Sequence, residues 1–279
     1  MSRQKFLFLL SLYFLTVQNV HANEARPYSG PFIGLNVGYG NSDLTLTATD
    51  VPRDSINGWS YPDFGGLNGI TFDDQLNGAL GGIDVGYNWN NEDWVYGVEA
   101  SYALLDLNHS DWTKADDKRQ PNLGEIKSGQ DDVFNSNLKS LALLSLRLGR
   151  KIDKLLLYGR AGFAAGDYHL SVVDENIPKT GIDTENNIGR GSDKKWLTGY
   201  SVGVGGEYLL NESWSAGLEY NYVRLDASNI NPGGTGCYNQ VVNNVNKGSC
   251  TGGDGLPVTY KMRPEIDLQL MAFHINYHF

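Results

Sequence analysis

The chain has 279 residues, and its 22 lysines and arginines against 32 aspartates and glutamates give a formal net charge of −10. Such an acidic chain lacks the basic face with which proteins bind nucleic-acid phosphates, so we expect no nucleic-acid partner. The 34 glycines and 16 tyrosines are typical of close-packed strands with aromatic girdles rather than of helices. The two cysteines suit export to an oxidising compartment.

The first 22 residues predict a secretory signal peptide. Arg3 and Lys5 form a basic start, residues 6–17 form a short apolar run, and residues 20–22 resemble a small-residue cleavage site. The apolar run is shorter than the ~20 residues of a membrane-spanning helix, and an uncleaved anchor is the alternative. We therefore expect a mature chain of residues 23–279, folded as one domain. Its net charge is −12, because the signal removes two basic residues and no acidic one.

Eight later segments alternate between apolar residues and polar or small residues, which is the period of a β-strand. The segments are residues 33–40, 79–89, 94–104, 142–149, 155–164, 200–208, 214–222 and 269–279. Each is close to the ~9–11 residues that a tilted strand needs to cross the hydrocarbon of a membrane. Since none is long enough for a spanning helix, the spanning structure must be a closed barrel, which satisfies its backbone internally.

The connections between these segments alternate between short and long. Residues 90–93, 151–154 and 210–213 are short polar turns, and residues 41–75, 105–137, 168–195 and 226–264 are long loops. This pattern predicts an all-β, eight-stranded antiparallel transmembrane β-barrel with four long extracellular loops and three short periplasmic turns. A soluble lipocalin-like barrel is the alternative, but it would bury its apolar face, whereas here the minor face carries the charge and the glycine.

The last strand ends the chain on its apolar face. Phe273, Ile275, Tyr277 and Phe279 form one alternating row, as lipid-facing residues of outer-membrane barrels do. We predict that this row is the assembly signal that the barrel-assembly machinery recognises. The predicted location is the bacterial outer membrane, reached through the periplasm, with the long loops at the cell surface.

Several segments resemble the porin-like outer-membrane β-barrel family, which includes small surface immunogens, opacity-type adhesins and haemin-binding proteins. The similar segments are residues 28–40, 81–89, 96–100, 204–208, 214–222 and 277–279. The resemblance spans nearly the whole mature chain and implies architecture rather than chemistry. It implies a surface protein with a structural or interaction role, not an enzyme. Its expected partners are outer-membrane lipid, lipopolysaccharide and a host-surface or haem ligand. The alternatives are a haemin-binding protein or a narrow small-solute pore.

Parity along the strands assigns a set of charged residues to the barrel lumen. The set is Glu99, Arg147, Arg160, Glu207 and Glu219, and Asp84 follows the same parity. The interior of an eight-stranded barrel is just wide enough for side chains to fill it. Charges there must pair, because an unpaired buried charge is costly. We therefore predict a plug of salt bridges, with an ion path as the alternative.

Cys237 and Cys250 lie in the last long loop and are expected to form a disulfide. The bridge would close a loop of about fourteen residues, worth roughly 3 kcal/mol in the chain-entropy model. A metal site is the alternative, but no histidine or third cysteine lies near them in sequence.

Three polar residue types are similar to the His/Ser/acid set of outer-membrane lipid A deacylases. His169 and Ser171, with Asp183 or Glu185, could support acyl hydrolysis. Their spacing is loose, so we interpret them as ordinary polar residues in contact with water. His109 and His169 could instead ligate haem iron, a hypothesis that only the family resemblance suggests. We expect no catalytic residue, no metal site and no cofactor.

The long loops are where we expect binding activity, since loops on a rigid scaffold concentrate binding residues. Their exposed aromatics offer anchors of the kind that dominate interfaces. These aromatics are Trp59, Tyr61, Phe64, Trp112 and Tyr238. Packing of loop against loop is the alternative role.

Overall fold

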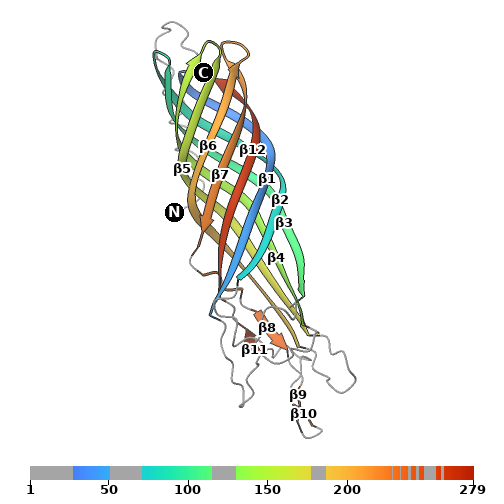
Figure 1. Cartoon of the computed structure of the whole chain (residues 1–279). Helices are drawn as coiled ribbons and strands as arrows, with labels where there is room; N and C mark the ends of the chain where they lie inside the picture. The colour runs from blue at the N-terminus through green and yellow to red at the C-terminus, as the bar shows by residue number, and fades with distance from the viewer. Residues whose placement is uncertain are drawn as a thin grey trace, which may run out of the picture.

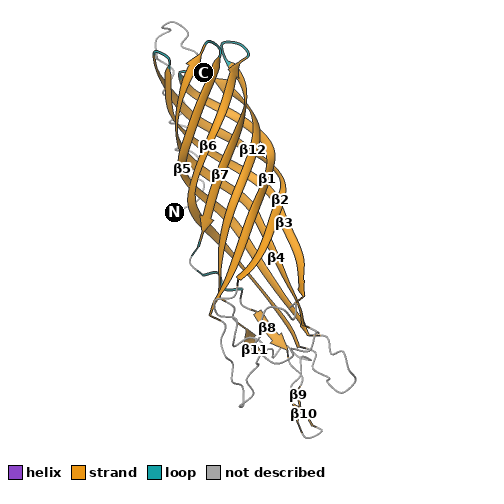
Figure 2. Ribbon diagram, viewed as in Figure 1, coloured by secondary structure: helices purple, strands orange, loops and turns teal. Residues whose placement is uncertain are grey.

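The computed structural model describes residues 28–50, 71–114, 130–176, 187–227, 229–232, 234–237, 240–242, 245–247, 256–258 and 261–279. Eight long strands form a closed antiparallel barrel (Figures 1 and 2). They are β1 (Gly30–Asp50), β2 (Thr71–Asn91), β3 (Trp94–Lys114), β4 (Gln130–Ile152), β5 (Leu155–Asn176), β6 (Asn187–Leu209), β7 (Trp214–Asp226) and β12 (Lys261–His278). β12 pairs with both β1 and β7, which closes the ring. The predicted fold class is confirmed.

The two ends of the barrel differ in their connections. At one end, which we call the turn end, β2 and β3 are joined by Glu92–Asp93 and β4 and β5 by Asp153–Lys154. Glu92 and Asp153 both have a φ of 54°, the left-handed conformation that tight two-residue hairpins require. The chain also ends at the turn end (Figure 1). The opposite end is called the loop end.

Four short strands lie at the loop end, within the last connection (Figure 1). They are β8 (Gly234–Cys237), β9 (Gln240–Val242), β10 (Val245–Lys247) and β11 (Leu256–Val258). β8 pairs with β6 on one side and with β11 on the other. Among the residues described, no helix is long and apolar enough to span a membrane.

The strands are longer than the sequence predicted, at the expense of the expected loops. Six of them have 21–23 residues, about twice the ~9–11 that cross the hydrocarbon. The predicted loops 41–75, 105–137 and 168–195 therefore begin and end as strand, and their expected boundaries are corrected. The first three loop-end connections shrink to residues 51–70, 115–129 and 177–186.

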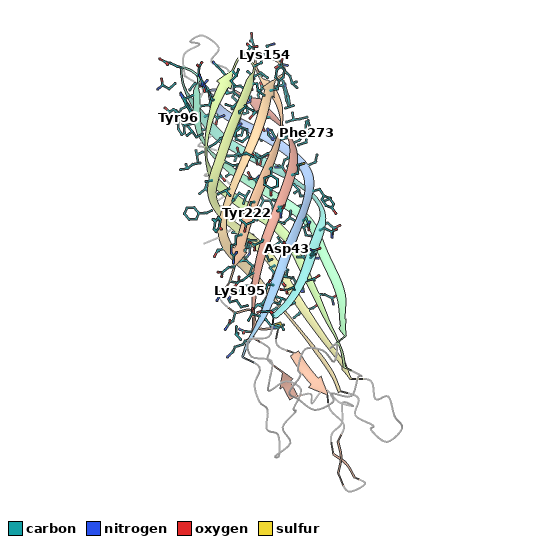
Figure 3. The ribbon with its side chains drawn as sticks, viewed as in Figure 1. Asp43, Tyr96, Lys154, Lys195, Tyr222 and Phe273 are labelled. Atoms are coloured by element: carbon teal, nitrogen blue, oxygen red, sulfur yellow. The ribbon has the colours of Figure 1, made fainter. Side chains whose placement is uncertain are left out.

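The extra strand length forms a second section of barrel with the opposite polarity. In β1, exposed Leu35 and Val37 face outward near the turn end, whereas Asp43 and Thr45 occupy the same face farther along. Figure 3 likewise places Phe273 nearer the turn end and Asp43 nearer the loop end. We call the half with the apolar outer face the membrane section and the half with the polar outer face the extension.

The interior of the extension is a hydrophobic core. Inward residues of all eight long strands are buried there, including Leu44, Leu76, Leu107, Leu138, Leu170, Leu197, Leu225 and Leu268. Buried polar contacts also lie within it: the hydroxyls of Ser136 and Tyr168 are 2.9 Å apart, and the Ser42 hydroxyl donates to the carbonyl of Leu76 at 3.3 Å. The extension is thus built like a soluble barrel, and the membrane section is its inverse.

Candidate functional site

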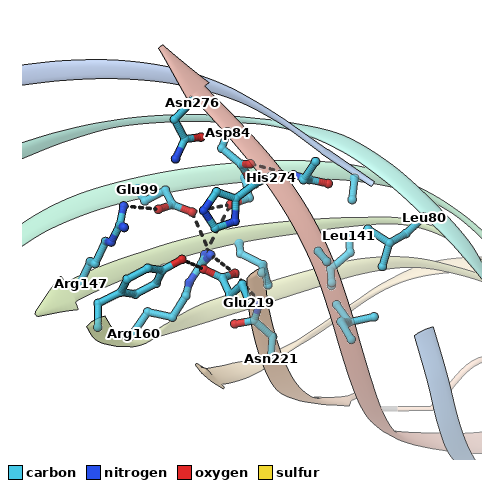
Figure 4. A pocket seen from close by; sticks show the side chains of 17 residues that line it. Leu80, Asp84, Glu99, Leu141, Arg147, Arg160, Glu219, Asn221, His274 and Asn276 are labelled. Carbon is cyan, nitrogen blue, oxygen red and sulfur yellow. Dashed lines mark hydrogen bonds and ion pairs between the residues drawn. The ribbon is translucent and has the colours of Figure 1, made fainter. Parts of the chain in front are cut away.

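The lumen of the membrane section holds an ionic cluster that we call the lumen network: Glu99, Arg147, Arg160, Glu207 and Glu219. All five are buried. The Arg160 guanidinium donates to Glu99 at 2.8 Å and to Glu219 at 2.6 Å (Figure 4). Arg147 donates to Glu207, and another of its nitrogens lies 3.8 Å from Glu99. The five residues come from β3, β4, β5, β6 and β7, so the network ties most of the ring together.

Glu207 is held by polar groups from β7 and β12. Ser215 donates to one carboxylate oxygen, the Asn276 amide donates to the same oxygen at 3.1 Å, and His278 Nε2 lies 3.1 Å from it. Glu207 has no exposed surface. A charge taken out of water is tolerated only when its partners satisfy it, which these groups do.

Glu219 and Arg147 are also held by uncharged side chains. The pattern of charges in the sequence does not identify these residues. Tyr158 donates to Glu219 at 2.7 Å, and the Asn221 amide donates to it at 2.5 Å. The Arg147 guanidinium lies 3.7 Å from the centre of the Tyr158 ring and 5.9 Å from that of Phe32. Cation–π contacts of this kind stabilise a desolvated guanidinium.

The network borders a small cavity of about 40 Å³ (Figure 4). Asp84 lines it and accepts a hydrogen bond from the Asn36 amide at 2.8 Å. The side-chain oxygens of Asn36, Asn221 and Asn276 have no protein hydrogen-bond partner. Because one water needs roughly 10–15 Å³, the cavity has room for a few waters rather than for a continuous aqueous path.

Tyr28 closes the lumen at the turn end. Its side chain is buried against Val95 and Leu209, and its hydroxyl lies 2.9 Å from the carbonyl of Lys154 and 2.7 Å from that of Glu207. Burial, followed by the Glu207 charge, raises the pKa of Tyr28, so the phenol stays a neutral donor. Tyr28 lies before the first strand, so strand alternation gave no signal for it.

The predicted assembly residues lie on the outer face of β12 near the turn end. Phe273 and Ile275 are exposed, and Phe279 is 71% exposed. The rings of Tyr277 and Phe279 meet edge to face at 4.9 Å. The Phe279 amide donates to the carbonyl of Pro31 at 3.1 Å. The last residue is therefore tied to β1, the strand that closes the barrel.

The two haem candidates lie on strands of the extension. His109 of β3 pairs with Ser136, and His169 of β5 pairs with Asn137. His169 is half-buried on the outer face, next to Leu170, which fills the interior. Among the described residues, no group of three histidine, cysteine or acidic side chains is placed to hold a metal ion.

Other candidate residues fall partly outside the described ranges. Ser171 lies in β5, but Asp183 and Glu185, the acids of the hydrolase hypothesis, lie outside. Cys237 ends β8, and Cys250 lies outside, so the disulfide stays a prediction. Of the loop aromatics, Trp112 belongs to β3, and the others, Trp59, Tyr61, Phe64 and Tyr238, lie outside.

A closed eight-stranded barrel with an apolar outer band and a charged interior defines a bacterial outer-membrane β-barrel protein. A family model described as "Outer membrane protein beta-barrel domain" matches residues 7–244. The chain belongs to this family, and its location is the bacterial outer membrane.

Relatives with curated names are outer-membrane proteins as well. The chain is 24% identical over 205 residues to a "31 kDa outer-membrane immunogenic protein" of Brucella melitensis biotype 1, covering 73% of each chain. It is 30% identical over 145 residues to a "22 kDa outer membrane protein" of Rhizobium leguminosarum bv. viciae, covering 52% of each.

Among solved structures, similar chains are also outer-membrane barrels. OprG from Pseudomonas aeruginosa is 14% identical, with a TM-score of 0.38 and coverage of 92% of this chain and 100% of that one. The outer membrane protease OmpT from Escherichia coli is 12% identical, with a TM-score of 0.44 and coverage of 90% and 97%.

Proposed function

We propose that this chain is a surface protein that acts through the segments at its loop end and uses the barrel as a closed scaffold. In this proposal the turn end faces the periplasm and the loop end faces outward. The observation that carries it is the filled lumen. The ionic network occupies the membrane section, and the hydrophobic core occupies the extension.

The extension supports the same proposal. Its polar outer face suits water or lipopolysaccharide sugars rather than hydrocarbon, and its apolar core makes it a rigid continuation of the barrel. It therefore lifts the loop-end connections beyond the lipid. The name of the Brucella relatives, which calls them immunogenic, is in keeping with surface-accessible segments.

A pore is the first alternative, and the lumen network argues against it. Moving an ion through would require separating buried arginine–glutamate pairs, which is costly. Haem binding and lipid A hydrolysis have no supporting geometry among the described residues. Haem binding, binding of a host-surface ligand and contact with lipopolysaccharide are forms that the interaction role can take, and we place that role at the loop end.

The test keeps the barrel and removes the connections. Residues 51–70, 115–129, 177–186 and 231–260 are each replaced by a short turn, which keeps the buried Ile230 in place, and assembly is followed by heat-modifiable migration on a gel. Binding of haemin and attachment of expressing cells to immobilised matrix proteins are then measured. We expect a folded barrel without either activity. An activity that survives the trimming would place the site in the barrel and overturn the proposal.

The pore alternative has its own measurement. The unmodified protein in a planar bilayer should give no steady conductance. Stable, repeated channel openings would mean that the lumen network is not a plug.

A further inference from the structure

The outer wall of the membrane section carries a groove of about 620 Å³ near the turn end. Its floor includes Gly159 on β5 and Gly206 on β6. Gly159 pairs with Leu148 on one side and with Val204 on the other, and both of these apolar side chains are exposed. Because Gly159 has no side chain, a shallow furrow runs over it between the apolar side chains of Leu148 and Val204.

The barrel itself does not require glycine at this position. A Cβ placed on Gly159 would meet only the carbonyl oxygen of Gly203, at 3.8 Å, which is ordinary van der Waals contact. Many inward glycines differ, since a Cβ there would clash with a neighbouring strand, as at Gly162 with the carbonyl of Leu144. Packing within the barrel therefore does not require the empty space above Gly159 on the outer surface.

One end of the groove carries opposite charges and an aromatic ring. Arg150 lines the groove, and its guanidinium lies 3.9 Å from the Asp93 carboxylate. The two side chains are 63% and 62% exposed, so both charges remain available to a ligand. Trp94, which pairs with Arg150, is also exposed and lines the same end. Tryptophan is enriched where hydrocarbon meets headgroups.

We propose that this groove binds a phospholipid with a phosphoethanolamine headgroup. An acyl chain lies over Gly159 between Leu148 and Val204. The phosphate is bound by Arg150, whose planar guanidinium matches phosphate oxygens, and the ammonium is bound by Asp93. In such a headgroup, phosphate and ammonium are separated by two carbons, so one molecule can bridge the neighbouring charges.

The charges select this headgroup over others. A phosphatidylglycerol offers the phosphate but no cation for Asp93, and it brings a negative charge close to that carboxylate. A phosphatidylcholine offers a cation without hydrogen-bond donors. Either should bind more weakly than phosphatidylethanolamine. The inference depends on the groove and not on the loop activity proposed above, so either can fail alone.

Native mass spectrometry of the detergent-purified full chain tests it, with phosphatidylethanolamine, phosphatidylglycerol and phosphatidylcholine of identical acyl chains. We expect phosphatidylethanolamine to be retained roughly fivefold more than the others, as about 1 kcal/mol from one exposed charge pair would give. Asp93→Asn should abolish that preference, and Arg150→Gln should lower retention of all three lipids. Gly159→Leu should lower retention whatever the headgroup.

Gly81→Leu is the matched control, since it makes the same change on the outer face of β2, where a Cβ likewise meets only a backbone oxygen at 3.8 Å. It should retain lipid like the unmodified protein. Equal retention of the three lipids, or full retention by Gly159→Leu, would show ordinary lipid contact only and overturn the proposal. Heat-modifiable migration checks that each variant folds, and the two charge variants change only exposed side chains.

Discussion

Asn276 of β12 lies directly across from Gly34 of β1, and its amide occupies the space that a side chain at position 34 would need. The same relationship recurs in two other cross-strand pairs, Asn88–Gly97 and Asn221–Gly203. Small and large inward residues alternate in this way in narrow barrels, because the interior cannot hold two large side chains side by side. At Asn276 and Asn221 the glycine gives the asparagine room to reach the lumen network.

Replacing Gly34 with valine should therefore destabilise the barrel. Overpacking of this kind costs ~1–3 kcal/mol, because the Asn276 amide must move and lose its hydrogen bond to Glu207. Urea unfolding in lipid vesicles measures the change. Gly81→Val is the control, since position 81 faces outward and a Cβ there meets only a backbone oxygen at 3.8 Å. Equal effects of the two changes would contradict this account.

Replacing Arg160 with methionine should lower the free energy of unfolding by more than replacing a surface arginine does. It leaves Glu219 buried without its arginine and Glu99 with only the longer 3.8 Å contact to Arg147, a loss of ~3–5 kcal/mol. Arg263→Met is the control. Arg263 is about half-exposed and lies 3.4 Å from Asp226, and such pairs are worth about 0–1 kcal/mol.

A variant of the network without these charges distinguishes the two causes of lost stability, an unpaired buried charge and lost packing. The triple variant Arg160→Met, Glu99→Gln and Glu219→Gln should recover part of the stability, because no unpaired charge remains. If the triple variant is as unstable as Arg160→Met alone, lost packing rather than a stranded charge explains the effect.

The change of polarity along the barrel should be measurable at single positions. Spin labels at Leu35→Cys and Asp43→Cys, in a background with both native cysteines replaced by serine, report the surroundings of the outer face. The label at position 35 should collide with oxygen in the lipid, and that at 43 with a water-soluble nickel complex. A lipid signature at position 43 would place the extension inside the membrane.

The same polarity change explains how far the sequence predicted the fold. The membrane-section strands and their number were found, because apolar residues on one face mark a lipid-facing strand. In the region of the extension, the sequence predicts loops. Leu44 and Leu46 alternate with Asp43 and Thr45 at the same period, but with the apolar residues on the inner face. A search for strands with apolar residues on the lipid-facing side does not detect strands whose apolar residues face inward.

The lumen was predictable in composition but not in detail. Parity placed Arg147 and Arg160 inside, whereas their partners depend on strand register and on how side chains cross the lumen. Arg160 reaches Glu219 of β7, two strands away. Neutral supports such as Tyr158 carry no charge signal at all, so only the folded barrel identifies them.

The Cys237–Cys250 disulfide is predicted to form without being needed for the barrel, because β8 lies beyond the eight-stranded ring. Alkylation under denaturing, non-reducing conditions should label neither thiol in the exported protein, and labelling after reduction is the control. Serine at both positions should leave heat-modifiable migration unchanged. Two free thiols in correctly exported protein would refute the bridge.

Deleting Phe279 should impair assembly in the outer membrane. The residue continues the outward row of β12, and its amide donates to the carbonyl of Pro31 in β1, where the barrel closes. We expect a smaller heat-modifiable fraction for the deletion and for Phe279→Ser, and near-normal assembly for Phe279→Tyr.

Phe163→Ser distinguishes a specific role of Phe279 from a general need for a hydrophobic outer face. Phe163 is a lipid-facing phenylalanine in β5 with 76% of its surface exposed. This variant should assemble better than Phe279→Ser, although both lose one exposed aromatic ring. Equal defects would mean that outer-face hydrophobicity alone matters. Normal assembly of the deletion would rule out Phe279 as part of the signal.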